Sequence, residues 1–186
     1  MLHLSPSQAS STLDAGGVIA YPTEAVFGLG CDPNNRDAIE KILQLKRRPW
    51  EKGLILVASD MQQLDAYVDF SALTLAQLAE TQAKWPGPFT FLMPKSKTLL
   101  PLLCGQFETI AVRVSAHPVV REICDHFGGA IVSTSANHAG EEPALTVAEI
   151  ESIFEHEIDA VITGALGDNP QPSTIIDIQT GKILRS

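Results

Sequence analysis

Short apolar runs recur along this chain, and segments with helical periodicity separate most of them. Between Asp37 and Leu45, for example, Ala38, Ile39 and Ile42 fall on one face of a helix. The predicted strands are residues 18–21, 53–58, 89–93, 109–114, 130–132, 160–162, 173–178 and 183–185. Strands that alternate with helices are typical of an α/β layered domain, and the strand-rich end favours a twisted, mixed sheet.

Capping residues mark where several helices start. Ser5-Pro6 places a capping residue before proline at the first helical position, and Gly16-Gly17 marks the end of that helix. A leucine-rich helical turn is expected around residues 99–103. The other predicted helix starts are Asp37, Asp60, Ser71, His117 and Thr146, and Thr146 is expected to form a capping box with Glu149. We expect residues 22–30, between the first strand and the Asp37 helix, to form a loop with a proline at its entrance.

Composition limits the class of protein. The 186 residues are 45% apolar and 19% charged, which suits one domain over residues 1–186. A net charge of -9 argues against a protein that coats nucleic acid through general basicity. The three cysteines form no CxxC pair and fit a reducing compartment. The sequence has no signal-peptide pattern and no apolar run of membrane-spanning length, so we expect a cytoplasmic protein without a membrane segment.

A cluster of cations stands out in this acidic chain. Residues 45–53 hold four of its 13 basic side chains, on the connection between the Asp37 helix and the next strand. We expect an extended segment in which Lys46 and Arg48, two residues apart, face the same side and bind the phosphates of a nucleotide. A solvated basic loop that stabilises the C-terminus of the preceding helix is an equally good reading. The chain has no GxxxxGK[ST] motif, so a P-loop is excluded.

Four polar or Gly/Pro-marked loops lie at the ends of predicted strands, at residues 22–30, 46–53, 133–143 and 163–173. Ligand sites of open α/β sheets gather at such loops. Residues 133–137 offer three hydroxyls and an amide that can bind phosphate or small-molecule oxygens. The alternative is a turn held by side-chain-to-backbone hydrogen bonds.

Arg113 interrupts an apolar strand, and alternation places it on the same face as Thr109 and Ala111. It faces either solvent or a polar cleft, where a carboxylate would be its best partner. Thr23 and Glu24 could bind substrate or Mg²⁺, although a single Glu is more often solvated or ion-paired. The sequence contains no HExxH motif and no clear Ser-His-Asp order, so it favours electrostatic over covalent catalysis.

Taken in order, these segments resemble the YrdC/TsaC family from about residue 12 to the C-terminus. The motifs that carry the resemblance are Pro22-Thr23-Glu24 with Gly28 and Gly30, Lys46-Arg47-Arg48-Pro49, Trp85-Pro86-Gly87-Pro88, Ala111-Val112-Arg113, Ser133-Thr134-Ser135-Ala136-Asn137, and Ser173-Thr174-Ile175 with Arg185. Each motif is weak alone, but their order and spacing are specific. The resemblance implies a single layered α/β domain with a large concave cleft.

The resemblance also implies an L-threonylcarbamoyladenylate synthase, which uses ATP with Mg²⁺, L-threonine and bicarbonate or CO₂ and releases pyrophosphate. Its product would pass to a transferase complex that modifies the adenosine beside the anticodon of tRNAs reading ANN codons. By analogy, the ATP-binding residues would be Lys46, Arg48, Thr109, Ser135 and Arg185. The threonine-binding residues would be Thr23, Arg113, Ser133 and Ser173. The catalytic residues would be Lys46, Arg48, Ser135 and Asn137.

The chemistry of these residues agrees with that activity. The amine of threonine can form a carbamate, and the carbamate oxygen can then attack the α-phosphorus, so the protein mainly holds two anions and neutralises charge. The chain differs from longer relatives at Ala25 and Val57, where those often have Thr and His that are associated with threonine. The main alternative is a module that binds RNA or tRNA in the same cationic cleft without catalysis. Another carbamoyl or nucleotidyl transfer in a related cleft is a third reading.

Overall fold

A computed structural model describes residues 1–169 and 171–186. Its helices are α1 (Ala9–Asp14), α2 (Arg36–Leu45), α3 (Leu75–Lys84), α4 (Pro101–Cys104), α5 (Pro118–Phe127) and α6 (Val147–Phe154). Its strands are β1 (Leu2–Leu4), β2 (Ile19–Pro22), β3 (Phe27–Gly30), β4 (Ile55–Ala58), β5 (Phe89–Pro94), β6 (Thr109–Val114), β7 (Ile131–Ser135), β8 (Ala160–Ile162), β9 (Thr174–Asp177) and β10 (Ile183–Arg185). The predicted α/β class with a mixed sheet is confirmed.

The described strands form one sheet in the order β1-β8-β2-β3-β7-β4-β6-β5-β9-β10. Strand β7 joins its two halves. The first part of β7 pairs antiparallel with β4, where Ile131 lies opposite Val57, and its end pairs with β3, where Ser135 lies opposite Gly28. On its other side, β4 pairs in parallel with β6, and this register places Val57 beside Arg113. Partnered residues share a face of the sheet, so Ile131, Val57 and Arg113 lie on the same face.

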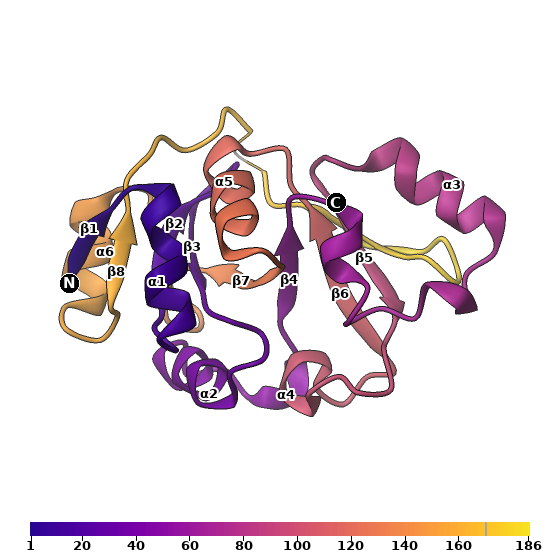
Figure 1. Ribbon diagram of the computed structural model, residues 1–186, viewed down its shortest axis with the longest axis horizontal. Coiled ribbons are helices and arrows are strands. Elements are labelled where there is room, and N and C mark those ends of the chain that lie inside the picture. Colours follow the sequence, from indigo (N-terminus) through magenta and orange to yellow (C-terminus); the bar gives the residue numbers. More distant parts are fainter. Residues whose placement is uncertain (170) are drawn as a thin grey trace.

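Helices α1 and α5 lie side by side over one half of this face (Figure 1). They bury Ile19 and Tyr21 of β2, Ile131 of β7 and Val57 of β4 in one apolar cluster. The opposite face of the sheet packs into a larger core that includes residues of α2 and α6. On β6, Ile110, Val112 and Val114 point into that larger core. Thr109, Ala111 and Arg113 therefore point to the face that α5 leaves uncovered.

Two strands were not predicted. Residues 22–30 were expected to be a loop, but Phe27–Gly30 is β3, which pairs with both β2 and β7. Its glycines hid the strand because they lower strand propensity. At Gly30, an added Cβ would lie 2.7 Å from the carbonyl oxygen of Val132 and 2.8 Å from the ring of Tyr21, so only glycine allows β3 to approach them. The other missed strand, Leu2–Leu4, is too short to show alternation.

Most of the predicted helices are present, and the two exceptions are the helices expected to start at Asp60 and at Ser71. The predicted capping box of Thr146 and Glu149 starts α6. Asp60 caps only a 3-10 turn, Met61–Leu64. The prediction of a helix start at Ser71 is wrong, because α3 begins after Thr74, whose side chain accepts a hydrogen bond from the Gln77 backbone. The Thr-x-x-Gln capping box at that position gives a stronger helix start than a single serine does.

Candidate active site

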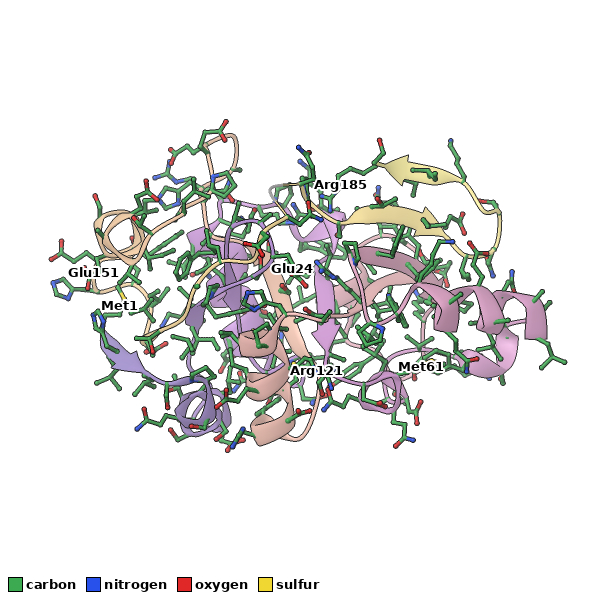
Figure 2. All side chains as sticks on the ribbon, turned by 90° about the horizontal axis from the view of Figure 1, so that it is seen from above. Met1, Glu24, Met61, Arg121, Glu151 and Arg185 are labelled. Atoms are coloured by element: carbon green, nitrogen blue, oxygen red, sulfur yellow. The ribbon has the colours of Figure 1, made fainter. Side chains whose placement is uncertain are left out.

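A cleft of about 770 Å³ occupies the face of the sheet beyond α5. This volume lies in the range of roughly 300–1,000 Å³ that is usual for small-molecule sites. Two of its lining residues, Glu24 and Arg185, lie near the middle of the molecule's length, whereas Met1 and Glu151 lie at one end (Figure 2). The predicted site residues that line it are Thr23, Arg48, Thr109, Arg113, Ser133, Ser135, Ser173 and Arg185. The concave cleft implied by the resemblance is therefore present, and most of the predicted residues meet in it.

Arg113 points into this cleft, which decides between the two orientations that alternation left open. Its Nε donates a hydrogen bond to the carbonyl of Gly87 at 3.0 Å, and its Nη2 forms an ion pair with Oε1 of Glu24. The two side chains are only 13% and 18% exposed. Burial lowers the pKa of Arg113, and the charge of Glu24 opposes that shift. The guanidinium is thus held in place and still reaches the ligand space.

A polar network continues from Glu24 to the start of α5. The hydroxyl of Ser115 donates to Glu24 Oε1 at 2.6 Å and accepts the backbone N–H of His117 at 3.0 Å. The Nδ1 atom of His117 is buried and has no hydrogen-bond partner within the described residues. Burial lowers the pKa of His117, which favours the neutral ring. His117 was expected at a helix N-terminus, and it is the N-cap of α5.

The sequence predicted that Lys46 lies on an exposed, extended loop, and this prediction is wrong. It is the C-cap of α2 and only 4% exposed. The helix ends in a Schellman motif: Arg47 N–H bonds to Gln44 O, Arg48 N–H bonds to Leu43 O, and Arg47 has a φ of 49°. Helical and left-handed backbone at residues 46 and 47 replaces the expected extended segment. Arg47 is accordingly exposed, while Lys46 is buried.

The ammonium group of Lys46 holds the loop that follows β7. Its Nζ donates to the carbonyl oxygens of Ser135 and Asn137 at 2.5 and 3.0 Å, and to Asn137 Oδ1 at 2.9 Å. Ser135 Oγ donates to the same Oδ1 at 2.7 Å. Neither Lys46 nor Asn137 is among the residues that line the cleft. Together they form a support behind its wall.

Arg48 lies in the cleft wall. Its Nε donates to the carbonyl of Gly53 at 3.1 Å and its Nη2 approaches that of Lys52 at 3.4 Å, which closes the loop before β4. That loop packs on α4 and the residues after it: Gln106 N–H bonds to Glu51 O at 3.1 Å, and Leu54 N–H to Leu103 O at 2.8 Å. Arg48 is therefore held by its own loop, and a segment distant in sequence supports that loop.

The C-terminal strands supply another cation to the cleft. Arg185 donates to the carbonyl of Ser173 through Nε and Nη2, at 3.0 and 2.8 Å, and to its hydroxyl at 3.1 Å. The same hydroxyl lies 2.7 Å from Oγ1 of Thr90 on β5. Burial lowers the pKa of Arg185, and the charge of Arg113 adds to the effect. The two guanidinium groups are therefore close enough to influence each other.

Four polar residues of the site were missed or left unassigned by the sequence. Tyr21 donates a hydrogen bond to Ser133 Oγ at 2.7 Å, and Thr90 contacts the Ser173 hydroxyl. Ser115 donates to Glu24, which in turn pairs with Arg113. Tyr21 and Thr90 lie inside apolar strands, so only the pairing of those strands reveals their contacts. Glu24 belongs to the Pro22-Thr23-Glu24 motif, but its partner Arg113 lies 89 positions further along the chain.

The described residues contain no group of three or more His, Cys, Asp or Glu side chains placed to hold a metal ion. The carboxylates that line the cleft are Glu24 and Glu142. Mg²⁺ commonly uses one or two carboxylates plus substrate phosphates, and this donor set fits that pattern. Within residues 1–169 and 171–186, no helix is long and apolar enough to cross a membrane.

The sequence model of a protein family matches residues 11–186 of the chain. It is the Sua5/YciO/YrdC family, described as "Telomere recombination". This chain belongs to the Sua5/YciO/YrdC family. The resemblance to the YrdC proteins inferred from the motifs is thereby confirmed.

Solved structures of similar proteins share the fold. Sua5 of P. abyssi complexed with L-threonine superposes with a TM-score of 0.88 at 25% identity, over 98% of this chain and 55% of that one. YciO of E. coli matches with a TM-score of 0.81 at 28% identity, over 100% of this chain and 93% of that one. MTH1692 of Methanobacterium thermoautotrophicum matches at 0.77 and 24% identity, over 97% and 85%. This family member therefore spans about half the length of Sua5 and nearly all of YciO.

Proposed function

We propose that this protein synthesises L-threonylcarbamoyl-AMP from L-threonine, bicarbonate or CO₂ and ATP, with release of pyrophosphate. The observation that carries the proposal is the convergence of Arg48, Arg113 and Arg185 on one cleft. Hydroxyl groups from β6, β7 and the start of β9 line the space between them. Family membership and the threonine complex of Sua5 support the same substrate class.

The two anions of the reaction fit different parts of the cleft. Arg48 and Arg185 supply positive charge for the triphosphate, with Thr109 and Ser135 as hydrogen-bonding groups. Arg113 supplies a charged donor for the carboxylate of threonine, and Thr23, Ser133 and Ser173 line the same cleft. Holding both substrates in one enclosed space converts the attack on the α-phosphorus into an intramolecular step, and fixed cations stabilise the departing pyrophosphate.

Lys46 and Asn137 act through the loop in this proposal. Lys46 anchors the backbone of Ser135 and Asn137, so it positions the Ser135 hydroxyl at the cleft wall. Its charge also adds to the positive potential behind the triphosphate. The assignment of both residues to catalysis thus stays a prediction, with positioning as the role their contacts support.

Mg²⁺ would enter with ATP as the counter-ion of its phosphates. Its chemistry there would be to neutralise charge on the β- and γ-phosphates, while the cleft offers Glu142 as a carboxylate donor. Delivery of the product to a tRNA-modifying transferase complex, direct contact with tRNA and a cytoplasmic location remain predictions. The cations that line the cleft are Arg48, Lys52, Arg113 and Arg185, and so few favour a small anionic ligand over an RNA track.

Pyrophosphate release measures the proposed reaction. The complete mixture of ATP, Mg²⁺, L-threonine and bicarbonate should release pyrophosphate, and omission of either threonine or bicarbonate should abolish the release. Release that does not depend on threonine would contradict the assignment. A steep loss of RNA binding with salt, together with no nucleotide turnover, would favour the RNA-binding alternative.

A further inference from the structure

Glu24 has no assigned role in the reaction, yet it lies beside the arginine assigned to the substrate carboxylate. We propose that Glu24 and Arg113 form a clamp for an amino-acid zwitterion, in which Arg113 binds the α-carboxylate and Glu24 binds the α-ammonium. This inference rests on the proposed function, because it takes an amino acid as the ligand of this part of the cleft. It assigns the ammonium group a partner of opposite charge.

Both side chains keep a free atom for the ligand. Ser115 and Arg113 both engage Oε1 of Glu24, and no hydrogen bond reaches its Oε2 within the described residues. Arg113 uses Nε for Gly87 and Nη2 for Glu24, and its Nη1 makes no hydrogen bond in the same set of residues. Nη1 of Arg113 and Oε2 of Glu24 are therefore the atoms that the clamp assigns to the amino acid, while the ion pair stays in place.

The charges of the pair select for a zwitterion. Two opposite charges that are mostly withdrawn from solvent form a site with no net charge, where both ligand charges meet a partner. A carboxylate without an ammonium group would be repelled by Glu24, and an amine without a carboxylate would be repelled by Arg113. Each single ion thus meets one unfavourable interaction that the zwitterion avoids.

The backbone around Glu24 is fixed before any ligand arrives. Thr23 donates to the carbonyl of Val26 through its N–H at 3.1 Å and through its hydroxyl at 2.7 Å, which closes a tight turn. Gly167 donates its N–H to the carbonyl of Thr23 at 3.0 Å and packs on Glu24 from the connection after β8. Preorganised charges of this kind bind without a large ordering cost.

Calorimetric titration of the ATP-free protein tests the clamp with three ligands. These are L-threonine, its analogue with a hydroxyl in place of the ammonium group, and threoninol, which lacks the carboxylate. The wild-type protein should bind threonine at least about 10-fold more tightly than either analogue, since a hydrogen bond to a charged group contributes about 1.5–3 kcal/mol. Equal affinities for the three ligands, or no binding of threonine, would overturn the clamp.

Glu24→Gln gives a second test, in which the affinities for two ligands should change in opposite directions. The amide still accepts the Ser115 hydroxyl but loses the charge, so threonine affinity should fall roughly 10- to 100-fold while affinity for the hydroxy analogue rises. If Glu24 only competed for Arg113, the substitution would leave threonine affinity unchanged or tighten it. The matched control is Glu108→Gln, an exposed glutamate outside the cleft lining, which should change neither affinity.

The two proposals can fail separately. If the wild-type protein prefers threonine and Glu24→Gln reverses that preference, the clamp stands even when no pyrophosphate is released. If pyrophosphate release requires threonine but Glu24→Gln keeps the same KM for threonine, the synthase stands and the clamp is wrong. The three-ligand comparison needs no variant, so it decides the question even if Glu24→Gln does not fold.

Discussion

The Nζ atom of Lys46 lies 2.9 Å from Oδ1 of Asn137, across 91 positions of the chain. This contact joins the end of α2 to the loop after β7, and a second bond from Nζ to the Asn137 carbonyl strengthens it. A helix end and a strand end are thereby held together behind the cleft wall. Lys46, from the most basic stretch of the chain, therefore uses its ammonium group for contacts within the protein.

Lys46→Met should reduce both stability and activity. Methionine fills a similar volume but leaves the partly buried acceptors of Ser135 and Asn137 without their donor, which costs about 1–3 kcal/mol in unfolding free energy. Urea unfolding measures that loss, and pyrophosphate release should fall with it because Ser135 is no longer held. A variant that keeps wild-type stability would show that these hydrogen bonds contribute little.

The pH dependence of the reaction should report on the same lysine. Burial, followed by the nearby charge of Arg48, lowers the pKa of Lys46 from 10.5 to about 8. If its positive charge supports ATP binding, kcat/KM for ATP should fall as pH rises through about 8. A rate that stays constant well above that pH would show that the charge of Lys46 is not required.

Stability should change with pH in the opposite direction to the rate. Between pH 8 and 10.5 the unfolded chain keeps a proton on Lys46 that the folded protein has lost, so the lysine makes the unfolding free energy rise with pH over that window. The comparison is the difference between the wild type and Lys46→Met, measured by urea unfolding across the window. A difference that is constant with pH would contradict the lowered pKa.

Arg48→Ala should abolish most turnover and leave the protein folded. Its guanidinium lines the cleft, and loss of one such donor to a transition-state anion costs on the order of 10²-fold in rate. Arg47→Gly is the matched control, because it removes the neighbouring cation at a left-handed position where glycine is preferred. The control should keep its activity and unfold at the same or a higher denaturant concentration. Equal losses in the two variants would point to a general charge effect.

Gly105→Ala should disturb the cleft from outside it. Gly105 has a φ of 63°, and an added Cβ would lie 2.3 Å from the carbonyl oxygen of Glu51. The loop that carries Arg48 would have to move, so we expect a loss of at least about 1–3 kcal/mol in stability and a higher KM for ATP. Gly128→Ala, at another glycine of positive φ but with no atom within 4 Å of the added Cβ, shows the cost of a positive φ without a steric clash. If both variants behave alike, the contact with Glu51 has no influence on the site.

The sequence predicted the parts of the fold that local patterns determine. Strict alternation placed Thr109, Ala111 and Arg113 on one face of β6, and these residues do face the cleft. The Thr146 capping box also marked the start of α6 correctly. β3 was missed because it contains two glycines, of which Gly30 is required by close packing against β7, and a local pattern does not reveal that packing.

The site was predictable as a set of residues but not as a set of contacts. Eight predicted residues line the cleft, some from loops beside the strands and others, such as Thr109 and Arg113, from one face of a strand. The inward turn of Lys46 depends on a left-handed Arg47, which a sequence without glycine at that position does not suggest. The Glu24–Arg113 pair was not foreseen, because it requires the register between distant strands.

The most direct measurement of the central claim is mass spectrometry of the nucleotide product made with isotopically labelled bicarbonate. If the cleft joins threonine, a one-carbon unit and AMP, the wild-type protein should form an adenylate that contains the amino acid and the labelled carbon. Arg113→Ala should form much less of it. An adenylate without the label, or hydrolysis of ATP with no adenylate at all, would contradict the account.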